Sequence, residues 1–262
     1  MDCWIDNSKK TCYISNFRAD CERNRNLTIQ YFTSNLFNRL LELKGYLGIH
    51  SSCVERNGHG IIFIGNRMTG KTTCMLNLLN NGFNLVNNDT AAIKYFANEH
   101  RVEAVGIVKN IFIRMNKNFS SQPQNQRFVR IAKERHVKYD GEVQLEDNRI
   151  VLTPLELTQL SHVELIPAVT LSAIVIPQYN ENLRNLRLTL QETTRYQDFF
   201  NSHILSLVHD TTSFLSDICI HESEICNVED CITGLSALPC YLCEYNDDTL
   251  FILANVIQDI LK

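Results

Sequence analysis

The fold is decided by the stretch Gly60-Ile61-Ile62-Phe63-Ile64-Gly65-Asn66-Arg67-Met68-Thr69-Gly70-Lys71-Thr72-Thr73. A short apolar run ends in a glycine, a polar loop follows, and apolar residues then recur at helical spacing. Residues Gly65 to Thr72 match the G-x-x-x-x-G-K-[ST] pattern of phosphate-binding loops, in the order of strand, loop and helix that such a loop requires. The stretch therefore predicts a site for the phosphates of a nucleotide.

Each type of residue in this loop has a physical role. Gly65 leaves the strand without a Cβ, and Gly70 lets the backbone close around an anion. The loop N–H groups then form a nest for phosphate oxygens, and the helix that follows adds the positive end of its dipole. Lys71 would reach the outer phosphates, and the Thr72 hydroxyl would ligate Mg²⁺. The predicted nucleotide-binding residues are Gly65, Asn66, Arg67, Met68, Thr69, Gly70, Lys71, Thr72 and Thr73.

Composition narrows the class of protein. The 262 residues are 44% hydrophobic and 21% charged, which is ordinary for a globular protein. A formal net charge of −4 and a pI near 6.1 argue against a nucleic-acid or polybasic membrane partner. No apolar run approaches the about 18 residues of a membrane span, and the amino terminus lacks the basic start and long apolar run of a signal peptide. We therefore expect a cytoplasmic protein.

The chain contains 10 cysteines. Without an export signal they are most simply reduced thiols. Cys240 and Cys243 form the only C-x-x-C pair, in an apolar run that predicts a strand, so their side chains should point to opposite faces. No second C-x-x-C or histidine pair completes a zinc set. Buried structural cysteines are favoured over a metal site.

Two further candidate residues flank the loop. The Asn57-Gly58 turn signal pairs the strand carrying His50 with the strand that feeds the loop. Asp89 follows a predicted strand at Phe83–Val86, where an acidic residue lies near the bound phosphates. It would hold Mg²⁺ or accept a proton from an attacking hydroxyl. A structural histidine and a turn-forming aspartate are the alternatives.

From Gly48 to Asp89 the chain resembles the catalytic core of the HPr serine kinase/phosphorylase family, within the phosphoenolpyruvate-carboxykinase-like nucleotide-binding fold. Asn88 departs from the family pattern, which has a pair of aspartates here, and the loop interior is not the usual small Ser/Gly set. The HPr kinases' own amino-terminal domain and second signature are missing, so the chain looks like the short stand-alone kinase-like members. The matching residues are His50, Gly60, Gly65 to Thr72, Gly82 and Asp89.

The resemblance implies an α/β fold with a mixed β-sheet P-loop core and flanking helices. We expect one kinase-like domain over residues 1–262: an amino-terminal extension and helix (1–47), the P-loop core (48–110), a lid or acceptor-binding region (111–150) and the remainder of the sheet and helices (151–262). Residues 127–138 are the most basic stretch of the chain. They are either a solvated helix face or a lid whose cations meet an anionic substrate.

Outside the core, the patterns predict elements of varied clarity. Apolar residues at helical spacing from Thr28 to Leu47 predict a helix that buries Ile29, Phe32, Leu36, Leu40 and Leu43. Thr153-Pro154-Leu155-Glu156 predicts a capped helix start. The other expected elements are a strand at Val102–Arg114, a hairpin of 138–143 with Arg149–Leu152, a central strand at Val169–Pro177, a mostly helical segment 181–233, a strand at Pro239–Tyr245 and a closing helix at Thr249–Leu261.

The leading hypothesis is an ATP- and Mg²⁺-dependent kinase. Lys71 would neutralise the transferring phosphoryl group, Asp89 would position or deprotonate the acceptor, and His50 would contact the phosphate or orient the acceptor. Thr72 and Asp89 are the predicted metal ligands. The resemblance implies a serine-type hydroxyl on a peptide or small molecule as acceptor.

Two alternatives are an NTPase or ligase-like accessory enzyme and a non-catalytic nucleotide-binding partner protein. The chain has no guanine-reading motif, which favours ATP over GTP. The sequence neither requires nor excludes a homo-oligomer.

Overall fold

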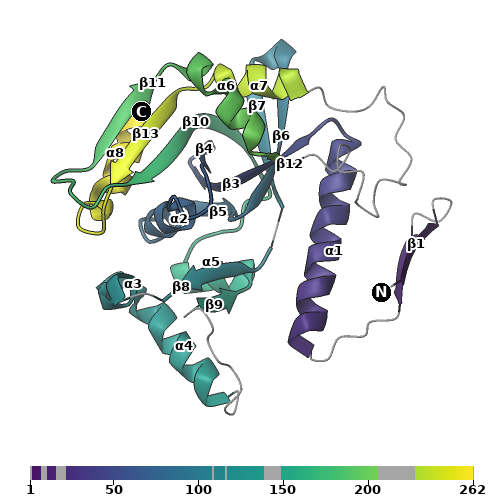
Figure 1. Ribbon diagram of the computed structural model, residues 1–262, viewed down its shortest axis with the longest axis horizontal. Helices are drawn as coiled ribbons and strands as arrows, with labels where there is room; N and C mark the ends of the chain where they lie inside the picture. The colour runs from purple at the N-terminus through teal and green to yellow at the C-terminus, as the bar shows by residue number, and fades with distance from the viewer. Residues whose placement is uncertain are drawn as a thin grey trace.

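The computed structural model describes residues 2–6, 11–15, 22–107, 109–115, 117–138, 149–205 and 228–261. These parts form a mixed α/β structure with a largely antiparallel sheet and flanking helices (Figure 1). The strands are β1 Asp2–Asp6, β2 Thr11–Ser15, β3 Leu47–Arg56, β4 His59–Ile64, β5 Asn84–Asn87, β6 Thr90–Phe96, β7 Arg101–Ile107, β8 Ile111–Arg114, β9 Arg149–Leu152, β10 Ala168–Tyr179, β11 Arg187–Gln191, β12 Ile204–Leu205 and β13 Cys240–Tyr245. The α-helices are α1 Glu22–Glu42, α2 Lys71–Leu79, α3 Lys117–Ser121, α4 Gln126–Lys138, α5 Pro154–Ser161, α6 Gln197–Ser202, α7 Val228–Ser236 and α8 Leu253–Ile260.

Within the described residues the main sheet has nine strands, ordered β11-β13-β10-β4-β3-β6-β7, with β5 and β12 also paired to β3. Strand β10 runs parallel to β4 and β13, and its first residues pair with β7, so β10-β4-β3-β6-β7 closes into a ring. The expected strand at Val169–Pro177 is confirmed beside the strand that precedes the loop. Its alternate side chains pack into clusters on both faces of the sheet, which explains why its sequence is apolar.

The hairpin of β3 and β4 is confirmed. Asn57 and Gly58 both have positive φ angles, 53° and 84°, which a two-residue type I′ turn requires. The register pairs Ser51 with Ile64. His50 therefore lies beside Gly65, at the end of the sheet where the loop begins.

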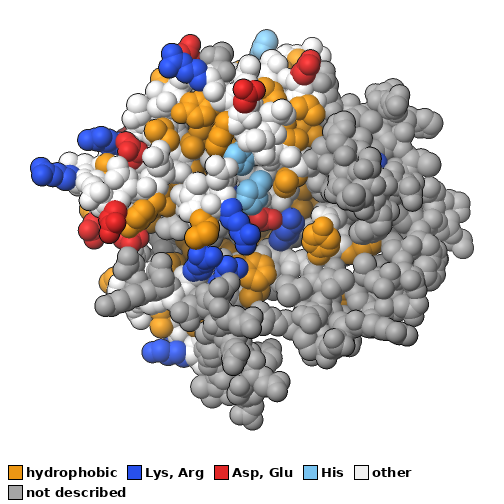
Figure 2. All heavy atoms as spheres, viewed as in Figure 1, with side chains coloured by type: hydrophobic (Ala, Val, Ile, Leu, Met, Phe, Trp, Pro, Cys, Tyr) orange, Lys and Arg blue, Asp and Glu red, His pale blue; other side chains and the backbone are white. Residues whose placement is uncertain are grey.

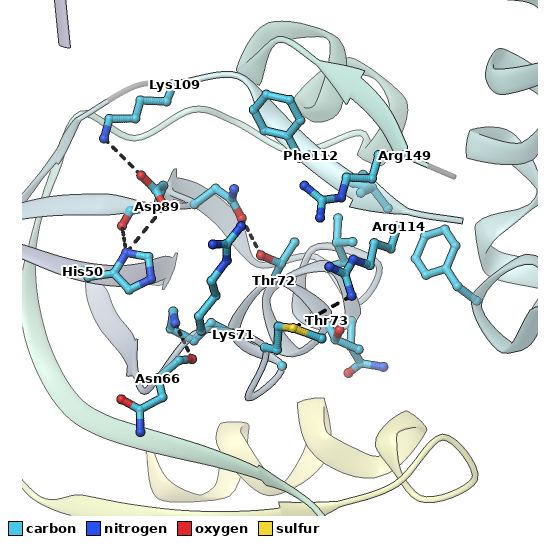
Figure 3. A pocket seen from close by; sticks show the side chains of 18 of the residues that line it. His50, Asn66, Lys71, Thr72, Thr73, Asp89, Lys109, Phe112, Arg114 and Arg149 are labelled. Atoms are coloured by element: carbon cyan, nitrogen blue, oxygen red, sulfur yellow. Dashed lines mark hydrogen bonds and ion pairs between the residues drawn. The ribbon is translucent and has the colours of Figure 1, made fainter. Parts of the chain in front are cut away.

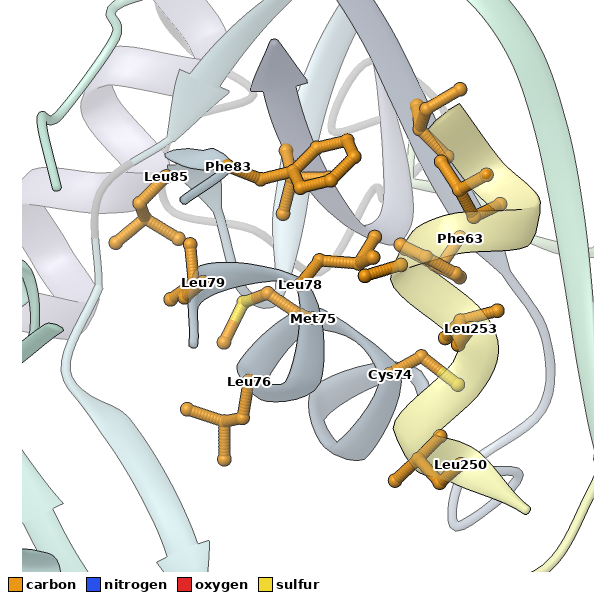
Figure 4. Packing of buried hydrophobic residues seen from close by; sticks show 14 of the residues in the cluster. Phe63, Cys74, Met75, Leu76, Leu78, Leu79, Phe83, Leu85, Leu250 and Leu253 are labelled. Atoms are coloured by element: carbon orange, nitrogen blue, oxygen red, sulfur yellow. The ribbon is translucent and has the colours of Figure 1, made fainter. Parts of the chain in front are cut away.

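Both faces of the sheet are covered. Strand β4 turns Ile61 and Phe63 towards the cluster under α2 and α8, and Ile62 and Ile64 towards the cluster under α6 and α7. Figure 4 shows Phe63 packed with side chains of α2 and α8. Strand β4, which precedes the loop, is therefore buried on both faces.

The cysteine prediction also holds. Cys240 belongs to the α6–α7 cluster and Cys243 to the α2–α8 cluster, on opposite faces of β13. The cysteines whose side chains the structure describes are buried free thiols. Burial raises the pKa of both thiols to about 12, so they stay protonated.

Helix α1 buries a different stripe from the expected one. Phe32 is buried, but Ile29 and Leu40 are exposed. The core side is instead occupied by Leu41 and by a buried ion pair in which Arg39 Nη1 lies 3.1 Å from Glu42 Oε2. A pattern of apolar residues alone cannot anticipate that a charged pair lies on the buried side of the helix.

The single strand expected at Val102–Arg114 is wrong. One strand, β7, ends at Ile107 and belongs to the main sheet. A second strand, β8, forms a separate two-stranded sheet with β9. Strand β9 thus takes β8 as partner, while residues 139–148 of the expected hairpin lie outside the described residues. A local pattern could not reveal this because β7 pairs with the neighbouring β6, whereas β8 pairs with β9, which lies far along the chain.

Other expectations fare unevenly. The capping box of α5 is confirmed, with Thr153 and Glu156 bonded to each other's backbone N–H. The strand at β13 and the closing helix α8 also form. The mostly helical character expected for 181–233 holds only in part: among the described residues, 193–202 and the start of α7 are helical, but Arg187–Gln191 pairs with β13 as a strand. No helix in the described parts is both long enough and apolar enough to cross a membrane.

Candidate active site

The loop between β4 and α2 opens on a cavity of about 1110 Å³. The cavity wall contains His50 and Asp89 and every predicted loop residue except Gly65 and Thr69 (Figure 3). Its charge is mostly positive, and Figure 2 shows basic side chains gathered near the middle of one face of the molecule. The charged side chains that line it are Arg67, Lys71, Asp89, Lys109, Arg114, Arg149 and Asp247.

The loop backbone is held in a conformation that only glycine allows at its last position. Gly70 has a φ of 102°, and a Cβ there would overlap the Tyr245 hydroxyl. That hydroxyl donates to the Thr69 carbonyl, 3.3 Å away, and the Thr69 side chain donates to the Asn66 carbonyl at 2.9 Å. These contacts hold the loop curved before α2 begins.

The amino terminus of α2 is open towards the cavity. Its N-cap residue is Gly70, which has no side chain to cap it, and its first turn carries no acidic residue. The first helical bond runs from the Cys74 N–H to the Gly70 carbonyl at 2.9 Å, which leaves the N–H groups of residues 71–73 without an intrahelical acceptor. Such a helix end attracts an anion through these donors and through its dipole.

Lys71 lies within the loop. Its Nζ donates to the Gly65 carbonyl at 2.6 Å and to the Asn66 carbonyl at 3.0 Å. Burial lowers its pKa to about 8, against the opposing influence of Asp89. The ammonium is therefore a poorly solvated cation held next to the open helix end.

Thr72 faces Asn88. The Thr72 hydroxyl donates to Asn88 Oδ1 at 3.0 Å, and the Asn88 carbonyl accepts from the Ser52 hydroxyl at 2.7 Å. The Thr72 hydroxyl oxygen and Asn88 Oδ1 suit Mg²⁺, which prefers oxygen ligands and takes several of them from substrate phosphates and water. Asp89, the other predicted metal ligand, lies in the same cavity wall, and the described residues hold no group of three or more acidic, histidine or cysteine ligands.

The Asp89 carboxylate contacts a lysine instead. Asp89 Oδ2 lies 3.0 Å from Lys109 Nζ, which also donates to the Thr90 hydroxyl at 3.0 Å. Burial alone would raise the pKa of this carboxyl, but Lys109, helped by His50 and Thr90, lowers it below its usual value. Asp89 is accordingly ionised at neutral pH.

His50 completes this side of the cavity. Its Nδ1 lies 2.9 Å from the Asp89 carbonyl oxygen and 3.4 Å from Asp89 Oδ1, and its backbone N–H donates to the His203 carbonyl at 2.9 Å. Burial, followed by the Lys71 ammonium, lowers its pKa, so the ring is neutral at pH 7. Because a carbonyl only accepts, Nδ1 carries the proton and Nε2 is left as an acceptor.

The sequence did not reveal Lys109. Its position follows from the register of β6 and β7, which pairs Thr90 with Ile107 and brings the residue two places further along beside Asp89. The turn between these strands was the available signal. Phe112, Arg114 and Arg149 were also missed, because they reach the cavity only through the pairing of β8 with β9.

The basic stretch 127–138 lies elsewhere in its described side chains. Arg127 bonds to Asn80 Oδ1 and to the Ser161 hydroxyl, and Arg130 forms an exposed pair with Glu134 at 3.9 Å. None of the side chains described at 127–134 lines the cavity. For these residues the contacts are those of a packed and solvated helix.

Comparison with known proteins gives a distant likeness of fold. No family model matches the chain, and no curated protein matches it. Among solved structures, the HPr(Ser) kinase/phosphatase from Coxiella burnetii is similar with a TM-score of 0.37 and 10% sequence identity, over 82% of this chain and 93% of that chain. A likeness at this level concerns at most the general arrangement of the chain and says nothing of its activity or partners.

Proposed function

We propose that this protein is an ATP- and Mg²⁺-dependent kinase that transfers the γ-phosphoryl group to a serine-type hydroxyl of a peptide or small molecule. One observation carries the proposal. The uncapped start of α2, the buried Lys71 ammonium and the ionised Asp89 all face one cavity. We take the chain as one kinase-like domain that works in the cytoplasm without a nucleic-acid or membrane partner.

The phosphates would bind at the start of α2. The N–H groups of residues 71–73 supply donors without a competing side chain. Lys71 would turn from the Gly65 and Asn66 carbonyls to the outer phosphates. Thr72 and Asn88 would hold the metal ion, which when bound adds positive charge beside the β- and γ-phosphates.

Asp89 and His50 would receive the acceptor. The acceptor oxygen forms the new bond to phosphorus, the bond to the bridging oxygen breaks, and the hydroxyl proton passes to Asp89 as ADP leaves. A carboxylate of lowered pKa is a weak base, but this reaction depends mainly on positioning. The unprotonated Nε2 of His50 suits a hydroxyl donor better than a phosphate oxygen, which favours orientation of the acceptor.

Product analysis tests the proposal. The protein is incubated with γ-labelled ATP, Mg²⁺ and a degenerate library of serine-containing peptides. We expect label on serine in step with ADP formation. Release of ADP and phosphate alone would favour the NTPase or ligase-like alternative, and binding without turnover would favour a nucleotide-binding partner protein.

Binding of a triphosphate should weaken as the pH rises past about 8 and should take up protons near that pH. Burial lowers the pKa of Lys71 to about 8 in the free protein, so part of it is neutral there. A bound triphosphate raises this pKa because it favours the charged form. Titration calorimetry in two buffers of different ionisation enthalpy measures the uptake.

Lys71→Arg provides the matched control for this titration. Its guanidinium stays charged, so it should bind the triphosphate without proton uptake from this position. Equal uptake by the wild type and by Lys71→Arg would contradict the assignment.

A further inference from the structure

The β8–β9 sheet presents two different faces. Alternate residues of β8 and β9 pack into the core cluster that includes α2, namely Ile111, Ile113, Ile150 and Leu152. The alternation of a strand turns the remaining residues the other way. On that side Phe112, Arg114 and Arg149 line the cavity, and we refer to these three residues as the β8–β9 platform.

The two arginines of the β8–β9 platform lie opposite each other on the paired strands. Arg114 and Arg149 are direct partners in the antiparallel register. Like charges directly opposite on a strand pair destabilise it. The Arg114 guanidinium donates through Nη1 to the Met68 sulfur at 4.0 Å. Both side chains line the cavity, so an anion bound on this side of it would meet two cations.

The β8–β9 platform also presents an aromatic side chain. Phe112 is 42% exposed, although it lines a cavity rather than the outer surface. An aromatic ring beside guanidinium groups is the combination on which nucleobases stack. Neither feature is needed for the phosphate contacts made by the loop.

The place of the platform in the cavity identifies its ligand. Figure 3 shows His50, Asp89 and Lys109 on one side of Thr72 and the platform on the other side. If the γ-phosphate faces Asp89, the rest of the nucleotide must leave the loop on the platform side.

We propose that the β8–β9 platform binds the nucleoside end of the nucleotide. Phe112 stacks on the base, and Arg114 and Arg149 contact the α-phosphate. This inference rests on the proposed function, since it takes the orientation of the nucleotide from it. A binding site for an anionic acceptor is the competing assignment, but an acceptor has to reach Asp89 on the opposite side.

Binding of two Mg²⁺-loaded probes, ATP and inorganic tripolyphosphate, tests the inference by titration calorimetry. Phe112→Ala should weaken ATP by about tenfold, the usual scale for loss of a stacked base, and leave tripolyphosphate unchanged. Arg114→Ala should weaken both probes, because it contacts phosphate. The matched controls Phe251→Ala and Arg130→Ala alter exposed residues outside the cavity and should change neither.

Each other outcome has a definite meaning. If Phe112→Ala and Arg114→Ala bind ATP as the wild type does, the inference is wrong. A raised KM for the acceptor in these same variants would then assign the platform to the acceptor. If Phe112→Ala weakens both probes equally, the platform does not read the base. If the wild-type protein binds neither probe, the proposed function falls, and this inference falls with it.

Discussion

Lys71→Ala should lower kcat/KM for phosphoryl transfer by about a hundred- to a thousandfold, the scale on which removal of one preorganised donor to a developing charge is felt. The Lys71 ammonium already lies next to the open end of α2, held by the Gly65 and Asn66 carbonyls. Its loss removes the cation that would neutralise the outer phosphates. Steady-state kinetics with ATP as the varied substrate measures the change.

Two controls make this result specific. Lys71→Arg keeps the charge and should retain triphosphate binding, although its planar group is shaped differently. Thermal unfolding of both variants should match the wild type within a few degrees, because removal of a partly desolvated cation does not open the core. Wild-type turnover by Lys71→Ala would remove the loop from the mechanism.

Asp89→Asn should lower transfer to the acceptor by about a hundred- to ten-thousandfold, the range for loss of a positioned acid–base group, and should change ATP affinity much less. The substitution keeps the shape of the side chain and removes the charge that faces Lys109 and His50. Single-turnover transfer and equilibrium binding, measured on the same sample, separate the two effects.

Asp247→Asn is the matched control, since Asp247 also lines the cavity but takes no part in the Asp89 cluster. It should transfer phosphate as the wild type does. Lys109→Met in the Asp89→Asn background shows whether an unpaired lysine causes the loss. If Asp89→Asn alone transfers at the wild-type rate, Asp89 neither positions nor deprotonates the acceptor.

The central part of the fold follows from local signals in the sequence. Asn57-Gly58 sets the β3–β4 turn by its positive φ angles, and Gly70 marks the residue where the chain must curve into α2. The capping box at Thr153 fixes the start of α5. Each signal acts over a few residues, so its physical meaning can be read without the rest of the molecule.

Other parts of the site depend on the register in which strands pair, and a local pattern does not set that register. Lys109 reaches Asp89 through the register of β6 and β7. Arg114 meets Arg149 only because β8 pairs with a strand far along the chain. The contact of Thr72 with Asn88 likewise needs the start of α2 to lie beside the end of β5. The sequence named residues that reach the cavity, but not the partners that determine their charge.

The role of Asp89 as a metal ligand stays a prediction. Its position after β5 is as expected, but the carboxylate contacts Lys109, and Asn88 is the residue that faces Thr72. The amide oxygen therefore takes the place in which the resemblance leads one to expect a carboxylate. This leaves Asp89 available to the acceptor.

A crystal structure with a non-hydrolysable ATP analogue and Mg²⁺ tests the central claim most directly. We predict the triphosphate on the N–H groups at the start of α2, Lys71 Nζ moved from the Gly65 carbonyl to the outer phosphates, and the γ-phosphate facing Asp89 and His50. A nucleotide bound elsewhere, or a γ-phosphate turned away from Asp89, would contradict the account.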